Sequence, residues 1–205
     1  MRGAARHDRA VAFDDGTAAL DAVPWGDLRH NYGTAEDVPG LLRACASTEP
    51  DQGAAAVGEL ENLLFHQGGW VCSAATAALP FLAMLACDTG VAARADVVET
   101  ISSLAREATI VEPRFVDHGW ASALRAVTPA LLGLLGDGDP AVRRAVVYLA
   151  GVGGIDVDLA LAALRARLRG EPETFAVSWR PWPGMRLMPR CGWLPSTGWR
   201  VSRNR

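Results

Sequence analysis

A triplet of Pro, Asp and Arg occurs twice along the chain with the same spacing, and this repetition restricts the possible folds. The triplets are Pro80, Asp88 and Arg94 in one copy and Pro129, Asp137 and Arg143 in the other. In both copies the Asp lies eight residues after the Pro, and the Arg lies six residues after the Asp. Each Pro precedes an apolar, helix-like run, so the pattern predicts repeated pairs of helices with a period near the ~40–47 residues of two-helix repeats.

The repeated triplet resembles the signature of the HEAT repeat, which has a Pro in its first helix, an Asp in the turn and an Arg in its second helix. The segment Asp137-Gly-Asp139-Pro140-Ala-Val-Arg143 matches it best. The chain thus resembles bacterial HEAT-repeat (armadillo-like) proteins over about residues 37–173. The resemblance implies an all-α fold, an α-α superhelix, in the form of a short right-handed solenoid of HEAT-like helix pairs. We expect the turn Asp to accept backbone N–H bonds and the Arg to bridge to an adjacent turn Asp.

Helix periodicity and capping signals predict three helix pairs and one further helix. The expected ranges are 37–46 with 51–65, 70–86 with 91–109, 120–135 with 140–152, and 156–169 alone, after two short helices at 17–22 and 25–30. The first pair is a degenerate copy, because Pro39 is followed by Ser47 and Gly53 where Asp and Arg are expected. We therefore expect a HEAT-like helical domain over residues 17–173, preceded by an irregular segment, 1–16.

Charge divides the chain into two unequal parts. Residues 1–173 carry 14 Arg and 23 acidic residues, a net charge of −9, whereas residues 174–205 carry six Arg and no acid. An acidic body repels phosphate backbones, so we expect no binding of duplex nucleic acid by this part of the chain.

The segment 174–205 departs from the repeat pattern. It is rich in Arg, Trp and Pro, with four of the seven Trp residues of the chain, and it shows neither a helical nor a strand period. Trp, Arg, Pro and Gly have GC-rich codons, so an out-of-frame or otherwise truncated end of the array would have this composition. The alternative is a basic-aromatic segment that binds nucleic acid or an acidic partner.

The sequence also bears on location. Asn62 to Cys87 lacks charged residues over a length that a membrane helix would need, but His66, Gly68, Gly69 and Pro80 interrupt it, so we expect no membrane span. The four Cys residues form no CxxC pair and the polar N-terminus lacks an apolar signal-peptide core, so we expect a cytoplasmic protein.

A second set of repeated residues precedes each Pro and suggests a partner-binding edge where loops between repeats gather. These residues are His30, Tyr32, His66, Gln67, Trp70, His118 and Trp120. Loop His and aromatic side chains are common recognition groups. The sequence favours a structural alternative, in which each Trp is a wedge between repeats and each His is a loop or cap residue. Three His on one edge also raise the possibility of a metal site, but successive repeats lie roughly 10 Å apart. Zinc ligands must lie within ~2.1 Å of one ion, so we expect no metal.

The sequence contains no G-x-S-x-G, P-loop or HExxH motif, so we expect neither catalytic residues nor a cofactor. The leading hypothesis is a non-catalytic scaffold or adaptor that binds another protein, as solenoid surfaces commonly do. The alternatives are a HEAT-like enzyme or enzyme helper, of the DNA-repair glycosylase or chromophore-lyase kind, and an inhibitor of the toxin-immunity type.

Overall fold

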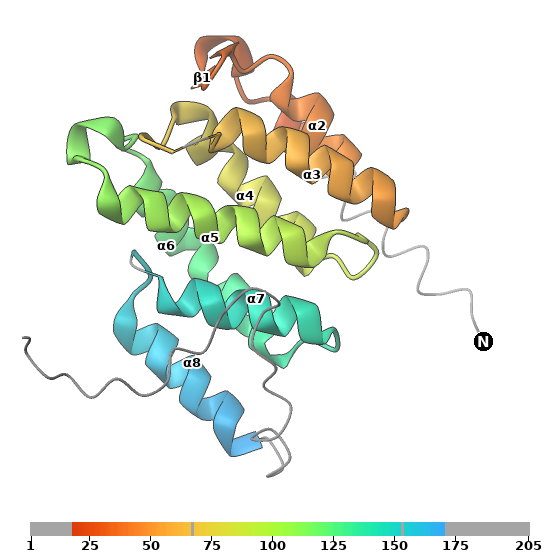
Figure 1. Cartoon of the computed structure of the whole chain (residues 1–205), viewed down its shortest axis with the longest axis vertical. Helices are drawn as coiled ribbons and strands as arrows, with labels where there is room; N and C mark the ends of the chain where they lie inside the picture. The colour runs from red at the N-terminus through yellow and green to blue at the C-terminus, as the bar shows by residue number, and fades with distance from the viewer. Residues whose placement is uncertain (1–17, 67, 153, 171–205) are drawn as a thin grey trace, which may run out of the picture. The chain divides into compact units, whose positions relative to one another are not determined.

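The computed structural model describes residues 18–66, 68–152 and 154–170, and this part of the chain is mostly helical (Figure 1). Its α-helices are α2 (Val38–Cys45), α3 (Pro50–Leu64), α4 (Ser73–Cys87), α5 (Arg94–Ile110), α6 (Trp120–Gly133), α7 (Pro140–Gly151) and α8 (Val157–Gly170). Three short 3-10 helices are η1 (Trp25–Asp27), η2 (Pro113–Phe115) and η3 (Leu134–Gly136). Strands β1 (Arg29–His30) and β2 (Gly33–Thr34) form a small antiparallel hairpin in which His30 pairs with Gly33. The predicted all-α class is confirmed.

The three predicted helix pairs and the further helix are all present, and most of their ends lie within one to three residues of the expected positions. The helix expected at 25–30 is wrong, because only η1 forms there. Leu28 then adopts an extended conformation and the chain enters the hairpin. Residues 18–21 are helical. The expectations for segments 1–16 and 174–205 lie outside the described residues.

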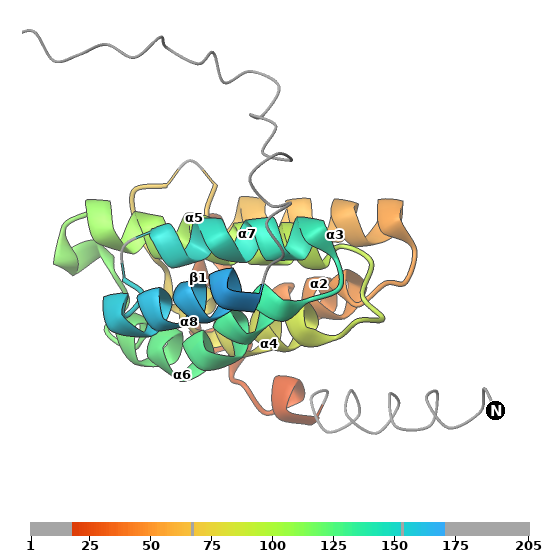
Figure 2. The same cartoon turned by 90° about the horizontal axis from the view of Figure 1, so that it is seen from below.

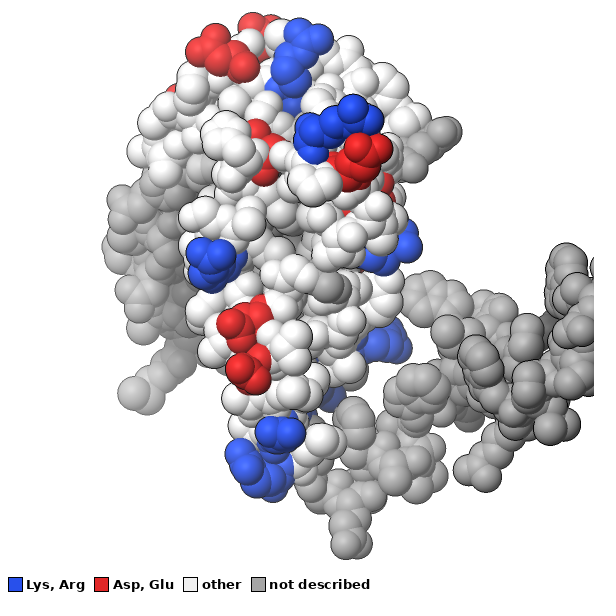
Figure 3. Space-filling model, turned by 90° about the vertical axis from the view of Figure 1, so that its left-hand side faces the viewer, with Lys and Arg blue, Asp and Glu red and all other residues white. Residues whose placement is uncertain are grey.

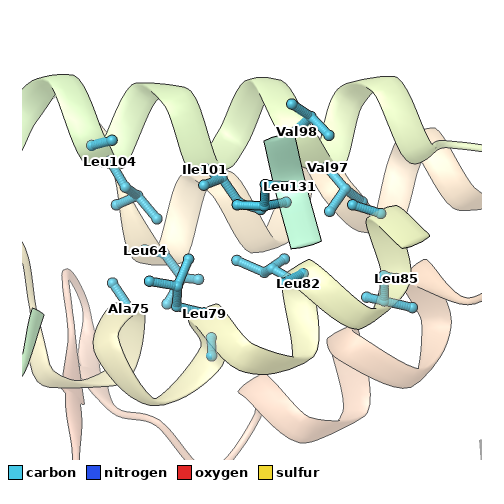
Figure 4. Packing of buried hydrophobic residues seen from close by; sticks show 14 of the residues in the cluster. Leu64, Ala75, Leu79, Leu82, Leu85, Val97, Val98, Ile101, Leu104 and Leu131 are labelled. Atoms are coloured by element: carbon cyan, nitrogen blue, oxygen red, sulfur yellow. The ribbon is translucent and has the colours of Figure 1, made fainter. Parts of the chain in front are cut away.

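The helices form two layers. Helix α4 packs against α2 and α6 in one layer, and α5 packs against α3 and α7 in the other, as Figures 1 and 2 show. Pairs α2–α3 and α4–α5 connect the layers. Leu79 and Leu82 from α4 point toward Ile101 and Leu104 from α5 (Figure 4), and all four side chains are fully buried. Burial of such apolar side chains is the main force that holds the layers together.

The repeated triplets occupy equivalent places in two helix pairs. Pro80 lies inside α4 and Pro129 inside α6. Asp88 Oδ1 accepts a hydrogen bond from the Gly90 N–H (2.7 Å) in the turn before α5. Asp137 Oδ1 accepts one from the Asp139 N–H (2.8 Å) in the turn before α7. Each Asp therefore orders the turn at the start of a second helix, as predicted.

Arg94 joins one helix pair to the next. Its Nε donates to the Ala86 carbonyl (2.8 Å), Nη1 donates to Asp137 Oδ1 (3.1 Å), and Nη2 donates to Asp137 Oδ2. The side chains of Arg94 and Asp137 are only 8% and 10% exposed. On the other side, Arg143 Nη1 donates to the Asp137 and Gly138 carbonyls. The hydrogen bond from Arg94 is the largest cause of the lowered pKa of Asp137. The Arg–Asp bridge expected between neighbouring repeats is thus present here.

The degenerate first copy makes a different contact with the next pair. Gly53 occupies the place of Arg94, and a Cβ there would lie only 3.2 Å from the Cβ of Ala93. The close approach lets the Ala92 N–H donate to the Ser47 carbonyl (3.0 Å). A backbone hydrogen bond therefore links the first pair to the second, where an Arg–Asp bridge links the second to the third.

The uncharged stretch from Asn62 to Cys87 is divided between two helices, because α3 ends at Leu64 and α4 starts at Ser73. Within residues 18–66, 68–152 and 154–170, none of the helices has both the length and the apolar character needed to cross a membrane.

Candidate functional site

Three loop segments meet where α3 and α5 end and α4 and α6 begin, at the left-hand side of Figure 1. We name residues 29–34, 66–72 and 112–119 together the loop edge; Gln67, predicted as part of it, lies outside the described residues. Val71 and Val116 form a parallel bridge in which the Val71 N–H donates to the Phe115 carbonyl (2.8 Å) and the Asp117 N–H donates to the Val71 carbonyl (2.9 Å). The bridge holds two segments that are 45 residues apart in sequence in a fixed register.

Asn31 attaches the hairpin to the rest of the loop edge. Its backbone N–H and its side-chain Nδ2 both donate to the Leu63 carbonyl, at 3.0 and 2.7 Å. Its Oδ1 accepts from Trp70 Nε1 (2.6 Å). Trp70 is half-buried, so one part of its ring is available at the surface while its indole N–H fixes the hairpin.

His30 has a structural role inside the hairpin. It is buried, its Nδ1 accepts from the Tyr32 N–H (3.0 Å), and its Nε2 lies 3.1 Å from Asp37 Oδ1. Because Nδ1 acts as the acceptor, Nε2 carries the proton and donates to the Asp37 carboxylate. The side chain of His30, predicted as part of the partner-binding edge, is thus enclosed and both its ring nitrogens are used within the hairpin region.

Tyr32 and His66 form a pair at the surface. The Tyr32 hydroxyl lies 2.5 Å from His66 Nδ1 and 3.2 Å from Asn62 Oδ1, and His66 Nδ1 lies 3.0 Å from the same Asn62 oxygen. The two rings meet edge to face with centroids 5.1 Å apart. His66 adopts a positive φ of 47°, an uncommon conformation for a residue other than Gly, which aims its ring at the hairpin. Tyr32 remains 57% exposed, so the pair presents a preformed aromatic group to solvent.

The loop edge is also hollowed into an open depression of about 380 Å³. Its lining includes Arg29, Trp70, Ser73, Arg114, Phe115 and His118. The Arg114 guanidinium stacks 4.7 Å above the Phe115 ring and pairs with Glu112 at 3.2 Å. The His118 side chain is fully exposed. The depression therefore combines aromatic surface with hydrogen-bonding and cationic groups, the composition found at the centres of protein interfaces.

Asp117 lies beside the exposed His118 at the rim of the depression. Its Oδ1 accepts from the Gly119 N–H (3.0 Å), and its Oδ2 lies 3.7 Å from His118 Nδ1. The Asp117 side chain is only 15% exposed. Within the described part of the chain, no group of three or more His, Cys, Asp or Glu side chains is arranged to hold a metal ion.

Comparisons with protein-family models, curated proteins and solved structures give no match. The candidate site therefore rests on its own geometry and chemistry.

The two Trp residues that looked equivalent in sequence have different roles. Trp120, predicted as part of the partner-binding edge, is the first residue of α6 and is 2% exposed, so it belongs to the core. Its burial fits the alternative packing role. Trp70 lies outside α4, because Val71 is extended and α4 starts only at Ser73 with Cys72 Sγ as its cap. Trp70, His118, Tyr32 and His66 are the predicted residues that the structure brings to the loop edge surface.

Glu107 supports the loop edge from below and was not predicted. It is buried in α5, and its Oε1 accepts a hydrogen bond from the Gly69 N–H. Gly68 adopts a φ of +79°, and a Cβ at this position would lie 2.7 Å from Glu107 Oε1. Only Gly fits there without displacing the carboxylate. The available sequence signal was an acidic residue three positions after Leu104, on the apolar face of α5.

Arg29, Arg114 and Phe115 were also missed. They lie in segments with no helical period. The bridge between Val71 and Val116 places the segment of Arg114 and Phe115, and a hydrogen bond from the Arg29 N–H to Ser73 Oγ (3.0 Å) places Arg29. No local pattern in the sequence predicts such non-local contacts.

Proposed function

We propose that the protein is a non-catalytic protein-binding module, built as a short HEAT-type solenoid, that recognises another protein with its loop edge. The observation that carries the proposal is the depression in the loop edge together with the exposed Tyr32–His66 pair, because aromatic and cationic side chains from three distant segments are presented there. Hydrogen bonds from Trp70 to Asn31 and between Tyr32 and His66 join the hairpin to the segment 66–72. Such preorganised aromatic and Arg groups are the usual source of affinity in protein interfaces.

The architecture supports the solenoid part of the proposal. The two layers, the repeated turn Asp and the Arg94–Asp137 bridge between consecutive helix pairs are the features that the HEAT resemblance implies. In a solenoid, loops from successive repeats gather along one edge, and the loop edge lies at such a place.

The charge pattern favours a protein partner over a polyanion. Figure 3 shows the side of the molecule on which the loop edge lies, and charges of both signs are scattered over it between uncharged patches. Together with the net charge of −9 for residues 1–173, this argues against duplex nucleic acid as the partner. Cys45 and Cys72 are buried free thiols, which fits our proposal of a reducing, cytoplasmic location.

The experiment that tests this proposal is a comparative pull-down with three versions of the full chain. The edge variant combines Phe115→Ala with His118→Ala. The control is Met84→Ala, since Met84 is 44% exposed and Phe115 is 43% exposed, but Met84 lies near the opposite end of α4 from the loop edge. We expect wild type and the control to capture the same protein, and the edge variant to lose it while its circular dichroism spectrum is unchanged. Capture of that protein by the edge variant at the wild-type level would refute the assignment of the loop edge.

A further inference from the structure

Helix α8 carries an apolar stripe of four residues, three of which are exposed while the fourth, Leu164, is half-buried at the border with the core. Val157, Leu161, Leu164 and Leu168 follow one another at intervals of four, three and four residues, which places them on one face of the helix. Val157 is 67% exposed, Leu161 41% and Leu168 63%. The helix attaches to the rest of the molecule by an adjacent face, on which Ala160 is buried and Ala163 and Leu164 pack against the core.

The spacing of the stripe is that of a coiled-coil seam. Apolar residues at alternating intervals of three and four keep one face of a helix turned toward a partner helix over two heptads. An isolated exposed Leu would need no explanation, but a continuous stripe of this kind on the surface indicates an interaction site.

Charges beside the stripe indicate which partner fits it. Asp158 and Arg165 are both exposed and flank the stripe on the side away from Ala160. Neither has an ion-pair partner in the part of the chain that the structure describes. They are seven residues apart, about 10 Å along the helix, which is too far for a contact within one helix.

The arrangement is complementary to itself. When two copies of α8 lie antiparallel with their stripes facing, Val157 of one copy lies opposite Leu168 of the other, and Leu161 lies opposite Leu164. The same register brings Asp158 of each copy beside Arg165 of the other, because flanking positions of the same kind meet in an antiparallel pair. A two-fold symmetric contact needs such a self-complementary surface.

We propose that α8 is a homodimerisation helix, which pairs antiparallel with α8 of a second copy of this chain. The helix of 14 residues is about 20 Å long, so this contact is small and the dimer dissociates on dilution. This inference stands apart from the binding of a different protein at the loop edge and does not depend on it.

Sedimentation of the full chain over roughly 1–200 µM tests the proposal, because a weak dimer depends on concentration. We expect the average mass to rise from that of a monomer toward that of a dimer. Leu161→Glu should keep the protein monomeric at every concentration with an unchanged helical spectrum. The matched control is Leu159→Glu, since Leu159 is 47% exposed on the same helix but lies off the stripe, and this variant should dimerise like wild type. A wild-type chain that stays monomeric at every concentration would overturn the proposal, whether the stripe is covered by another segment of the chain or remains exposed.

A charge exchange tests the antiparallel register. Asp158→Arg alone places two Arg beside each other twice in the dimer, and Arg165→Asp alone places two Asp together, so each variant should raise the dimer Kd at least tenfold. An equimolar mixture of the two variants should associate again, as should the chain that carries both changes. If the mixture stays as dissociated as the separate variants, the antiparallel pairing is wrong.

Discussion

Removing the Arg94 side chain should destabilise the fold through the contact between consecutive helix pairs. In Arg94→Ala, the Asp137 carboxylate loses two hydrogen bonds and the Ala86 carbonyl loses one, in a place where both side chains are about nine-tenths buried. Breaking a buried ion pair by removing one partner costs about 3–5 kcal/mol. Asp137 keeps the Asp139 N–H, and Arg143 remains next to it, so we expect a loss near the lower end, about 3 kcal/mol.

The measurement is urea unfolding followed by circular dichroism, in a double-mutant cycle of Arg94→Ala and Asp137→Ala. We expect a coupling free energy of at least about 1.5 kcal/mol between the two residues. Arg106→Ala on the exposed face of the same helix is the control and should change the free energy of unfolding by less than about 0.5 kcal/mol. A coupling energy below about 0.5 kcal/mol would mean that the bridge does not hold the helix pairs together.

Three further predictions concern other parts of the same structure. Because the pKa of Asp137 is lowered in the folded state, its contribution to stability should be complete above the ordinary carboxyl pKa of 3.8. This contribution should decline as the pH falls from 3.8 through the lowered pKa. An Arg94–Asp137 coupling energy that stays constant from neutral pH into this acid range would contradict the prediction. Trp120→Ala should cost about 3–5 kcal/mol, the usual loss for a buried aromatic, and an unchanged thermal midpoint would show that Trp120 is not in the core. Gly68→Ala should lower the free energy of unfolding by about 1–3 kcal/mol, because the added Cβ would contact Glu107 and φ at this position is positive. Denaturant unfolding measures the loss. The control is Gly58→Ala inside α3, where nothing lies within 4 Å of the new Cβ.

The helices of this protein could be predicted well because their signals are local. Pro39, Pro80 and Pro129 with the apolar runs that follow them determine the first helix of each pair, and Asp139 with Pro140 gives a strong start for α7. The Arg94–Asp137 contact could also be anticipated, since the equal spacing of two triplets implies equivalent positions in neighbouring units.

The surface of the loop edge could be predicted only in part. Trp70 and Trp120 lie ten and nine residues before their Pro residues, but Trp120 is the first residue of α6 whereas Trp70 precedes the start of α4 at Ser73. Their environments differ because Val71, next to Trp70, pairs with Val116, a non-local contact that no short pattern reveals. Whether a loop His is buried, as His30 is, or exposed, as His118 is, depends on the same kind of tertiary contact.

The most direct test of the proposed binding role is a calorimetric titration of the protein captured by the wild-type chain. The titration compares wild type, the Phe115→Ala/His118→Ala edge variant and the Met84→Ala control. We expect the edge variant to bind at least about tenfold more weakly, as truncation of an interface aromatic commonly does, and the control to bind within about twofold of wild type. Equal affinities for wild type and the edge variant, with both proteins fully folded, would contradict the account, because the partner would then bind elsewhere on the chain.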